Sequence, residues 1–264
     1  MSWLQRIKTL RRKTIEWQHA LIPERIREKF DAEEYSITQF IKLASSQVES
    51  TDRVLDAGAG TCAYKSFFEH AQYESTDIKD YYGNDPNWQH TFLSDLTEIP
   101  RPNNFYDVIV NTQVLEHVRD PQAVIHEFYR ILKPGGTLYL TAPQGWGIHE
   151  APHNYFNFTS YGLKLLFENA GFSIEEITPR GGIFWYLGKQ LRVLPDYILT
   201  QFFKEQHDGV ESFAPSPWLP LMMVWYASTA PPLKFILPLI LHPIDQIDRQ
   251  QTFTLGYACI CKKP

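Results

Sequence analysis

The sequence contains little of what marks secreted, nucleic-acid-binding or membrane-targeted proteins. Only three of its 264 residues are cysteine, too few for a disulfide framework. Cys62, Cys259 and Cys261 are expected to be buried, reduced thiols of a cytoplasmic protein. A net charge of −5 argues against a general nucleic-acid-binding protein, which would carry a basic surplus. The N-terminus has no continuous apolar core, so no signal peptide is visible.

The composition is that of a folded protein with a substantial core. Hydrophobic residues make up 44% of the chain and aromatic residues 14%, which excludes disorder. The length fits one large domain or one domain with an insertion. We expect an N-terminal helical segment (1–48), a central core (49–180), an apolar insertion (181–250) and a final strand of the core (251–264).

The core is organised around a glycine turn. Residues 53–57 are typical of a buried strand, and Gly58 and Gly60 predict a tight turn into a helix over 62–70. Glycine allows a sharp turn and the close approach of a ligand, while the first N–H groups of a helix face the same pocket. The turn therefore predicts a ligand site at the carboxyl end of the strand.

Charge indicates which ligand the turn binds. Gly58-x-Gly60-x-x-Ala63 fits the dinucleotide fingerprint, with Asp77 following Gly60 by 77 − 60 = 17 residues. An anionic pyrophosphate is a poor match for the acids that recur after successive predicted strands, which are Asp56, Asp77, Asp95 and Glu116. S-adenosylmethionine carries a sulfonium and an ammonium without phosphate, so we favour it over NAD.

Further motifs follow the turn in a fixed order. They are Val-Leu-Asp-Ala-Gly-Ala-Gly at 54–60, Asp77, Ser-Asp-Leu at 94–96, Phe-Tyr-Asp-Val-Ile-Val at 105–110, Val-Leu-Glu-His-Val at 114–118 and Leu-Lys-Pro-Gly-Gly-Thr-Leu at 132–138. With these motifs, residues 50–180 resemble the small-molecule-type branch of the class I S-adenosylmethionine-dependent methyltransferases. The resemblance implies a Rossmann-like α/β fold: a seven-stranded, mostly parallel sheet with one antiparallel strand and helices on both faces.

The resemblance also implies roles for individual residues. Asp77 would bind the ribose hydroxyls and Asp95 the adenine amino group. The full set of expected cofactor contacts is Asp56, Gly58, Gly60, Asp77, Asp95, Leu96 and Gln113. A base is needed only where the acceptor loses a proton, and the candidates that follow the fourth and fifth predicted strands are His149, His117 and His153.

One stretch offers a rival function. His149-Glu150-Ala151-Pro152-His153 matches the zinc-protease motif H-E-x-x-H, which works only on a helix. Pro152 and the preceding glycines predict a loop instead. The stretch is similar to a loop of many bacterial methyltransferases of this branch, including ones that act on glycans or lipids, with Asn154 and Asn157 replacing an Asp and an Arg.

No metal is predicted near this loop. Some methyltransferases bind a divalent metal through Glu-x-x-Glu-His, and Gln113 occupies the position of the first acid in this chain.

The two flanking segments leave alternatives open. Residues 1–30 predict a helix with an apolar stripe and basic residues, which either packs on the domain or lies on an anionic membrane surface. The insertion has no charged residue over 212–233. Its prolines, Pro215, Pro217, Pro220, Pro231 and Pro232, are expected to break it into pieces too short to cross a bilayer. We expect a lid over an apolar pocket or a homodimer contact, with docking on the inner membrane face as the alternative.

Together these features predict an S-adenosylmethionine-dependent O-methyltransferase. Its acceptor is expected to be a small molecule, a glycan or a lipid-linked compound. The alternatives are an NAD-dependent oxidoreductase and a non-catalytic scaffold that binds S-adenosylmethionine.

Overall fold

The computed structural model of the chain describes residues 23, 26, 28–78, 90–201, 205–207, 210–212 and 218–264. Contacts divide the chain into two compact units. The first comprises Met1–Tyr35 with Gly181–Thr252, and the second Ser36–Arg180 with Phe253–Pro264. Most of the helix predicted over residues 1–30 lies outside the described residues.

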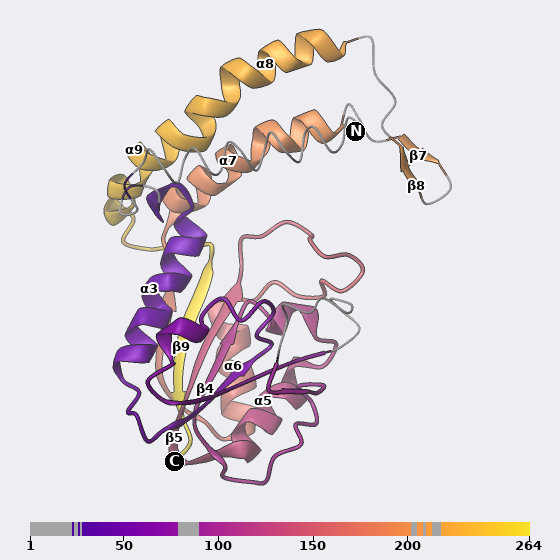
Figure 1. Cartoon of the computed structure of the whole chain (residues 1–264). Helices are drawn as coiled ribbons and strands as arrows, with labels where there is room; N and C mark the ends of the chain where they lie inside the picture. The colour runs from indigo at the N-terminus through magenta and orange to yellow at the C-terminus, as the bar shows by residue number, and fades with distance from the viewer. Residues whose placement is uncertain are drawn as a thin grey trace. The chain divides into compact units, whose positions relative to one another are not determined.

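The second unit is built on a seven-stranded sheet in the order β3-β2-β1-β4-β5-β9-β6 (Figure 1). Its strands are β1 (Arg53–Ala57), β2 (Gln72–Asp77), β3 (Phe92–Leu93), β4 (Tyr106–Thr112), β5 (Leu132–Pro143), β6 (Ser173–Pro179) and β9 (Gly256–Lys262). The strands from β3 to β5 pair in parallel, and β9 runs antiparallel between β5 and β6. The predicted fold class is confirmed.

Local signals explain the helices of this unit. Helix α5 (Pro121–Ile131) begins where the Asp120 carboxylate accepts a hydrogen bond from Ala123 N at 3.0 Å, with proline at its first position. Helix α6 (Ser160–Ala170) begins at Thr159 and ends at Gly171, whose φ is +93°. An N-cap residue at the start of each helix, followed by proline in α5, and a glycine after the last turn of α6 are the local sequence signals of these ends.

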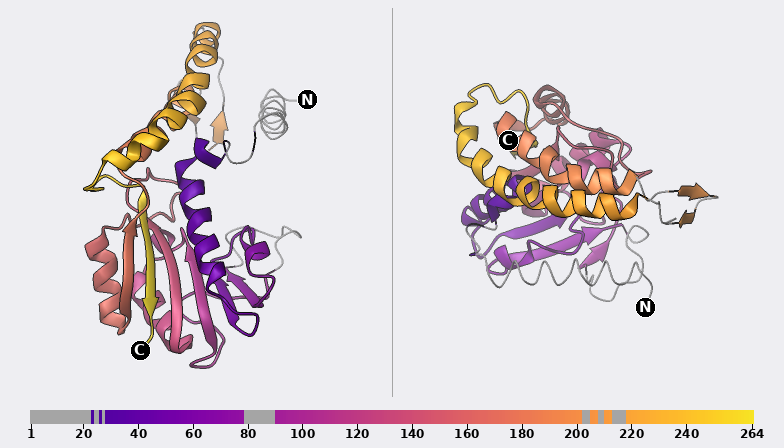
Figure 2. Two further views of the ribbon diagram at one scale, coloured as in Figure 1. Left: turned by 90° about the vertical axis from the view of Figure 1, so that its left-hand side faces the viewer. Right: turned by 90° about the horizontal axis from the view of Figure 1, so that it is seen from above.

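Two apolar clusters fill the core, and Figure 2 shows the sheet with its helices from further sides. Phe128 of α5 and Phe167 of α6 belong to one cluster with Leu55 and Ile109 of the sheet. Ile41 of α3 (Ala32–Ser46) belongs to the other, together with neighbouring residues of β1 and β4. Alternate residues of the central strands thus serve both clusters, as expected of a sheet buried on both sides.

The structure corrects three sequence-based expectations in this unit. The helix predicted over 62–70 is a series of turns with one 3₁₀ turn, η2 (Lys65–Phe67). Cys62 adopts φ +54°, which an α-helix does not contain. Cys62 is also only half-buried, whereas Cys259 and Cys261 are buried free thiols as expected. Finally, the pair Gly135-Gly136 would predict the end of a helix, whereas α5 ends at Ile131 and both glycines lie within β5.

The first unit is mostly helical. After the short turn η1 (Glu28–Phe30) it contains α7 (Ile183–Gln201), a hairpin of β7 (Glu205–His207) and β8 (Val210–Ser212), then α8 (Leu219–Pro231), the π-helical turn η4 (Pro232–Ile236), α9 (Leu237–Ile244) and η5 (Asp245–Ile247). The expectation that prolines break this segment into short pieces is wrong, because Leu221–Ile247 is one continuous helical run.

The prolines are accommodated in two ways. Pro220 lies in the first turn of α8, where a backbone N–H has no partner within the helix. At Pro231 and Pro232 the hydrogen bonding widens to a π-turn, with Leu237 N donating to Pro232 O. Pro215 and Pro217 lie outside the described residues.

The pairing of β9 with β5 predicts one sensitive position. A Cβ on Gly256 would overlap the Ala142 carbonyl oxygen and lie 2.8 Å from Pro143 Cα. Gly256→Ala should therefore lower the free energy of unfolding by about 2 kcal/mol, as overpacking does. Gly147→Ala is the matched control, since its Cβ would meet no atom of the described residues within 4 Å. Urea unfolding of both variants checks this, and equal stability would contradict the strand pairing.

Candidate active site

Hydrogen bonds join the glycine turn to the last two residues of β2. Gly58 N and Ala59 N donate to Thr76 O at 2.9 and 3.0 Å, and Gly60 N donates to Asp77 Oδ2 at 2.8 Å. Gly58 and Gly60 have φ +77° and +51°. A Cβ on Gly58 would lie 2.5 Å from Val114 Cγ2. Glycine at this position is therefore required by the packing of the chain itself, a reason that the sequence analysis missed.

The other predicted cofactor residues follow the carboxyl ends of β2, β3 and β4. Asp77 Oδ1 accepts from Ile78 N at 2.7 Å, and Asp95 Oδ1 accepts from Thr97 N and Thr97 Oγ1, both at 2.8 Å. Leu96 is buried. Gln113 has φ +54°, and its Nε2 donates to Thr141 Oγ1 at 3.1 Å. The sheet thus brings these residues to one edge, as expected from parallel strands, and their cofactor contacts stay predictions.

Asp56 is a buried carboxylate next to this turn. It is 2% exposed, and its Oδ2 accepts from Tyr73 OH at 2.8 Å. Burial raises the pKa of Asp56 to about 6, the Tyr73 hydrogen bond lowers it, and the negative charge of Asp77 raises it further. Ionised Asp56 is therefore costly unless a cation approaches it.

Two supporting residues escaped the sequence analysis. Asn111 is fully buried in β4, and its Nδ2 donates to Ala57 O at 2.8 Å, which holds the last residue of β1. An amide at the end of the apolar run 108–110 was a signal that could have been used. Tyr73 lies 17 residues from Asp56, and nothing in the local sequence indicates that pairing.

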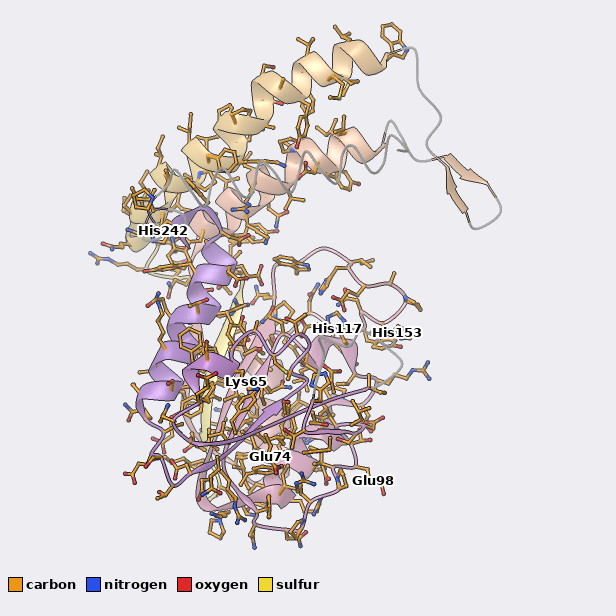
Figure 3. All side chains as sticks on the ribbon, in the orientation of Figure 1. Lys65, Glu74, Glu98, His117, His153 and His242 are labelled. Atoms are coloured by element: carbon orange, nitrogen blue, oxygen red, sulfur yellow. The ribbon has the colours of Figure 1, made fainter. Side chains whose placement is uncertain are left out.

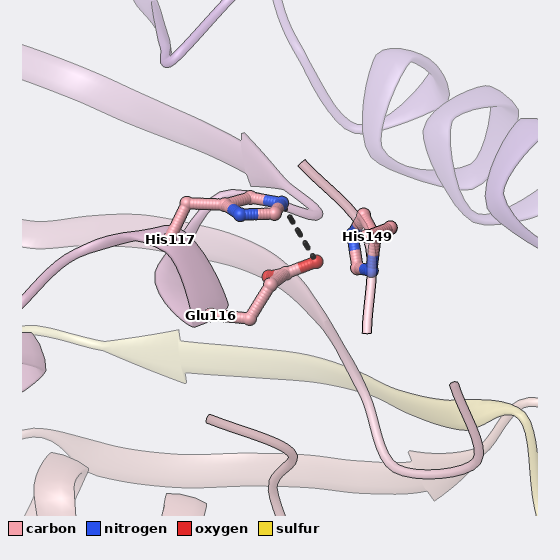
Figure 4. A group of neighbouring side chains, drawn as sticks. All are labelled: Glu116, His117 and His149. Carbon is pink, nitrogen blue, oxygen red and sulfur yellow. Dashed lines mark ion pairs between the residues drawn. The ribbon is translucent and has the colours of Figure 1, made fainter. Parts of the chain in front are cut away.

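A cluster of histidines and glutamates follows β4 (Figure 4). Glu116 is fully buried in η3 (Leu115–His117), and His117 Nε2 lies 3.8 Å from Glu116 Oε1 and 3.9 Å from Glu150 Oε2. The rings of His117 and His149 are 4.8 Å apart between centroids. Ligand atoms of Glu116, His117 and His149 lie within 4.8 Å of one another, and among the described residues this group could hold a metal ion.

The loop after β5 brings the predicted histidines together. His117 Nδ1 lies 2.8 Å from His153 O, and His153 Nδ1 lies 3.2 Å from Tyr155 OH. Figure 3 shows His117 and His153 close to one another at this edge of the sheet. Tyr155 N donates to Glu116 O at 2.8 Å, so the loop is tied to η3.

Residues 149–153 are not helical, so the geometry that the zinc-protease motif needs is absent there. Of the two amides that replace charged residues in the resembling loop, Asn157 has a structural use. Asn157 Nδ2 donates to Trp146 O at 3.1 Å and closes the loop.

The raised pKa of Asp56 predicts a pH-dependent stability. Because the native carboxyl keeps its proton between about pH 4 and pH 6 while the unfolded one loses it, the contribution of Asp56 to stability falls as pH rises through this range. Asp56→Asn should therefore stabilise the cofactor-free chain at about pH 7.5 by on the order of 2 kcal/mol, and much less at about pH 4.5. Urea unfolding at both pH values measures this. Asp120→Asn is the control, because Asp120 is exposed, and a gain equal at both pH values would contradict the assignment.

Comparison with known proteins agrees with this geometry. Residues 27–177, more than half of the chain, match the model of a family described as methyltransferase domain. A probable S-adenosylmethionine-dependent methyltransferase of Mycolicibacterium smegmatis is 32% identical over 112 residues, which are 40% of this chain and 38% of that protein. A ubiquinone biosynthesis O-methyltransferase of Klebsiella pneumoniae is 47% identical over 36 residues, 14% of this chain and 15% of that one. These matches cover well under half of the relatives' lengths.

Solved structures share the fold. The putative methyltransferase of Haloferax volcanii, in complex with the activator Trm112, has a TM-score of 0.51 at 15% identity and covers 91% of this chain and 93% of its own. The cyclase SpnF has the same TM-score at 20% identity and covers 86% of this chain and 81% of its own. The family match identifies the cofactor as S-adenosylmethionine rather than NAD. The chain belongs to the family of class I S-adenosylmethionine-dependent methyltransferase domains.

Proposed function

We propose that the chain transfers the methyl group of S-adenosylmethionine to a hydroxyl oxygen of a small-molecule, glycan or lipid-linked acceptor. The observation that carries the proposal is the pair of histidine rings, His117 and His149, beside two carboxylates at the edge of the sheet where the predicted cofactor residues lie. A positioned base distinguishes transfer to a hydroxyl from transfer to an acceptor that needs no deprotonation.

The reaction is a displacement at the methyl carbon. The acceptor oxygen attacks this carbon, the carbon–sulfur bond breaks, and its electron pair returns to sulfur to give S-adenosylhomocysteine. The hydroxyl proton moves to an imidazole nitrogen, so a neutral ether or ester is formed. Holding the two reactants in line supplies much of the rate, and a positioned base adds typically 10²–10⁴-fold.

Hydrogen bonding indicates which histidine nitrogens are basic. A carbonyl oxygen can only accept, so His117 Nδ1, 2.8 Å from His153 O, carries the proton of the neutral ring. The same holds for His149 Nδ1, 3.0 Å from Gly147 O. Nε2 of each ring is left as the proton acceptor. Glu116 and Glu150 near His117 Nε2 then stabilise the imidazolium that forms.

Aromatic side chains of the loop favour an acceptor with apolar surface. The rings of Trp146 and His149 lie 5.7 Å apart between centroids, and Tyr155 and Phe156 are each 38% exposed. Such rings pack against the apolar faces of sugars, lipids and aromatic compounds. Asn154 and Asn157 are neutral, so they favour an acceptor that does not need a charged partner at these two positions of the loop.

The cofactor assignment predicts a selective loss of affinity. Asp77→Asn keeps an oxygen for Gly60 N but loses the charge that accepts from the ribose hydroxyls, so the Kd for S-adenosylmethionine should rise about tenfold, equivalent to about 1.4 kcal/mol. Isothermal titration measures this, with NAD as the comparison ligand. Asp107→Asn is the control. Asp107 pairs with Lys133 near the start of β4, away from the carboxyl ends of the strands where Asp77 lies. An unchanged Kd would remove Asp77 from the cofactor site.

The histidine assignment predicts a split between turnover and binding. His149→Ala and His117→Gln should each lower turnover by about 100-fold while the Kd for S-adenosylmethionine stays within about twofold. The assay follows a tritiated methyl group from the cofactor into aqueous and lipid fractions of cell extract, with identification of the labelled atom.

Controls separate the remaining alternatives. His126→Ala changes a histidine on α5 that lies against Asn169 O and should retain turnover. Label found on nitrogen or carbon would contradict the assignment of a hydroxyl acceptor. Full turnover in both histidine variants would contradict the assignment of a histidine as the base.

Persistent absence of label would favour a non-catalytic scaffold. A loss with chelator that divalent metal restores would place a metal at Glu116, His117 and His149, against the expectation of no metal.

A further inference from the structure

We infer that a helical hairpin of the first unit inserts into the hydrocarbon region of a lipid bilayer. This apolar hairpin consists of α7 and the run from α8 through η4 to α9, which lie side by side in Figure 1 and pack against one another. The inference goes beyond methyl transfer and rests on the length, exposure and internal pairing of the hairpin.

The helical run is long and exposed. Leu221–Ile247 spans 27 residues with a mean hydropathy of 1.2 over its most apolar window, of which 11% is buried. At 1.5 Å per residue it extends about 40 Å, against about 30 Å for the hydrocarbon core of a bilayer. Core helices of soluble proteins are mostly buried, and signal sequences lie near the N-terminus. Neither explanation fits this run.

Apolar residues lie on all sides of α8, because residues 221–227 are all aliphatic or aromatic over two helical turns. Met223, Val224 and Leu221, which span an arc of about 160° about the helix axis, are 45%, 68% and 63% exposed. The sequence has no charged residue over 212–233. A lid or a dimer contact would cover one side of such a helix, whereas a bilayer covers all of its exposed sides. Lipid is therefore the occupant that this pattern favours.

Polar groups of α8 bond within the hairpin. Ser228 Oγ and Thr229 Oγ1 each donate to Trp225 O at 2.8 Å. Lys234 Nζ donates to Asp196 Oδ1 and Oδ2 of α7 at 2.7 and 2.6 Å, and Tyr226 OH donates to Asp196 at 2.8 Å. Hydrocarbon offers no partner for polar groups, so internal bonding is the condition for insertion.

The remaining charged residues of α7, Lys189 and Arg192, lie in the first ten residues of the helix and are paired with carboxylates that precede it in the sequence. Lys189 Nζ lies 3.4 Å from Glu33 and 3.6 Å from Asp31, and Arg192 lies 3.5 Å from Asp31. At the start of the helix, Asp245 accepts from Gly182 N and Trp185 N at 2.7 and 2.9 Å. The hairpin is therefore polar at this end and apolar along α8, which suits entry from one side of a membrane with the polar end at the headgroups.

Flotation of the full chain with vesicles tests the inference. With neutral phosphatidylcholine vesicles in about 0.5 M NaCl, which screens surface charge, the wild-type chain should float with the lipid. The double variant Leu221→Lys with Val224→Lys should float at least about tenfold less, because each lysine opposes burial in hydrocarbon. Leu165→Lys, on an exposed position of α6 that is 58% accessible, is the matched control and should float as the wild type does.

Two further readouts make each outcome decisive. Binding of S-adenosylmethionine shows that the double variant keeps its fold. Phosphatidylcholine brominated at mid-chain should quench the tryptophan fluorescence of the wild-type chain. The quenching should be weaker in Trp225→Phe and as strong as in the wild type in Trp146→Phe. This measurement does not depend on the lysine variant. A wild-type chain that neither floats nor is quenched overturns the inference. A soluble dimer that is dissociated by the double variant would also overturn it, because the exposed surface of α8 would then be a dimer contact. Flotation that occurs only with anionic vesicles at low salt would overturn it as well, because binding would then depend on surface charge.

Discussion

The hydrogen bonds that tie the glycine turn to the end of β2 determine where everything else in the site lies. They hold Gly58 and Gly60 at the carboxyl edge of the sheet, and Gly58 packs directly against Val114. Val114 leads into η3, whose Glu116 carbonyl binds the loop after β5 through Tyr155 N. The residues expected to bind the cofactor and the histidines expected to take a proton are thus joined by one short series of contacts within one unit.

Asp56 gives this arrangement a second property. A buried carboxylate beside a second acid disfavours its own ionisation, and a cationic ligand removes that penalty. A cationic ligand at this place would therefore gain binding free energy from the relief of a cost that already exists in the empty protein. The pyrophosphate of a dinucleotide would instead add negative charge there, and the methyltransferase family to which the chain belongs uses S-adenosylmethionine.

Much of the fold was readable from the sequence because its signals are local. Asp120 before Pro121, and Thr159 and Gly171 around α6, mark helix ends by their own chemistry. The prediction failed where backbone geometry decides, at Cys62 with its positive φ and at Pro231 and Pro232, where a π-turn keeps the helix continuous. In the site, the sequence indicated which residues gather at the edge. It could not indicate their partners, since Asn111 binds Ala57 and His117 contacts His153 across 54 and 36 residues.

The position of β9 in the sheet affects the order in which the protein can be completed. β5 and β6 each take β9 as a neighbour, and β9 is translated after the whole of Gly181–Thr252. During synthesis the two older strands leave the ribosome with unpaired edges, which stay open to wrong partners until the last strand arrives. The helical insertion thus emerges before the methyltransferase sheet is closed, so the nascent chain can meet other surfaces while its catalytic half is still unfinished.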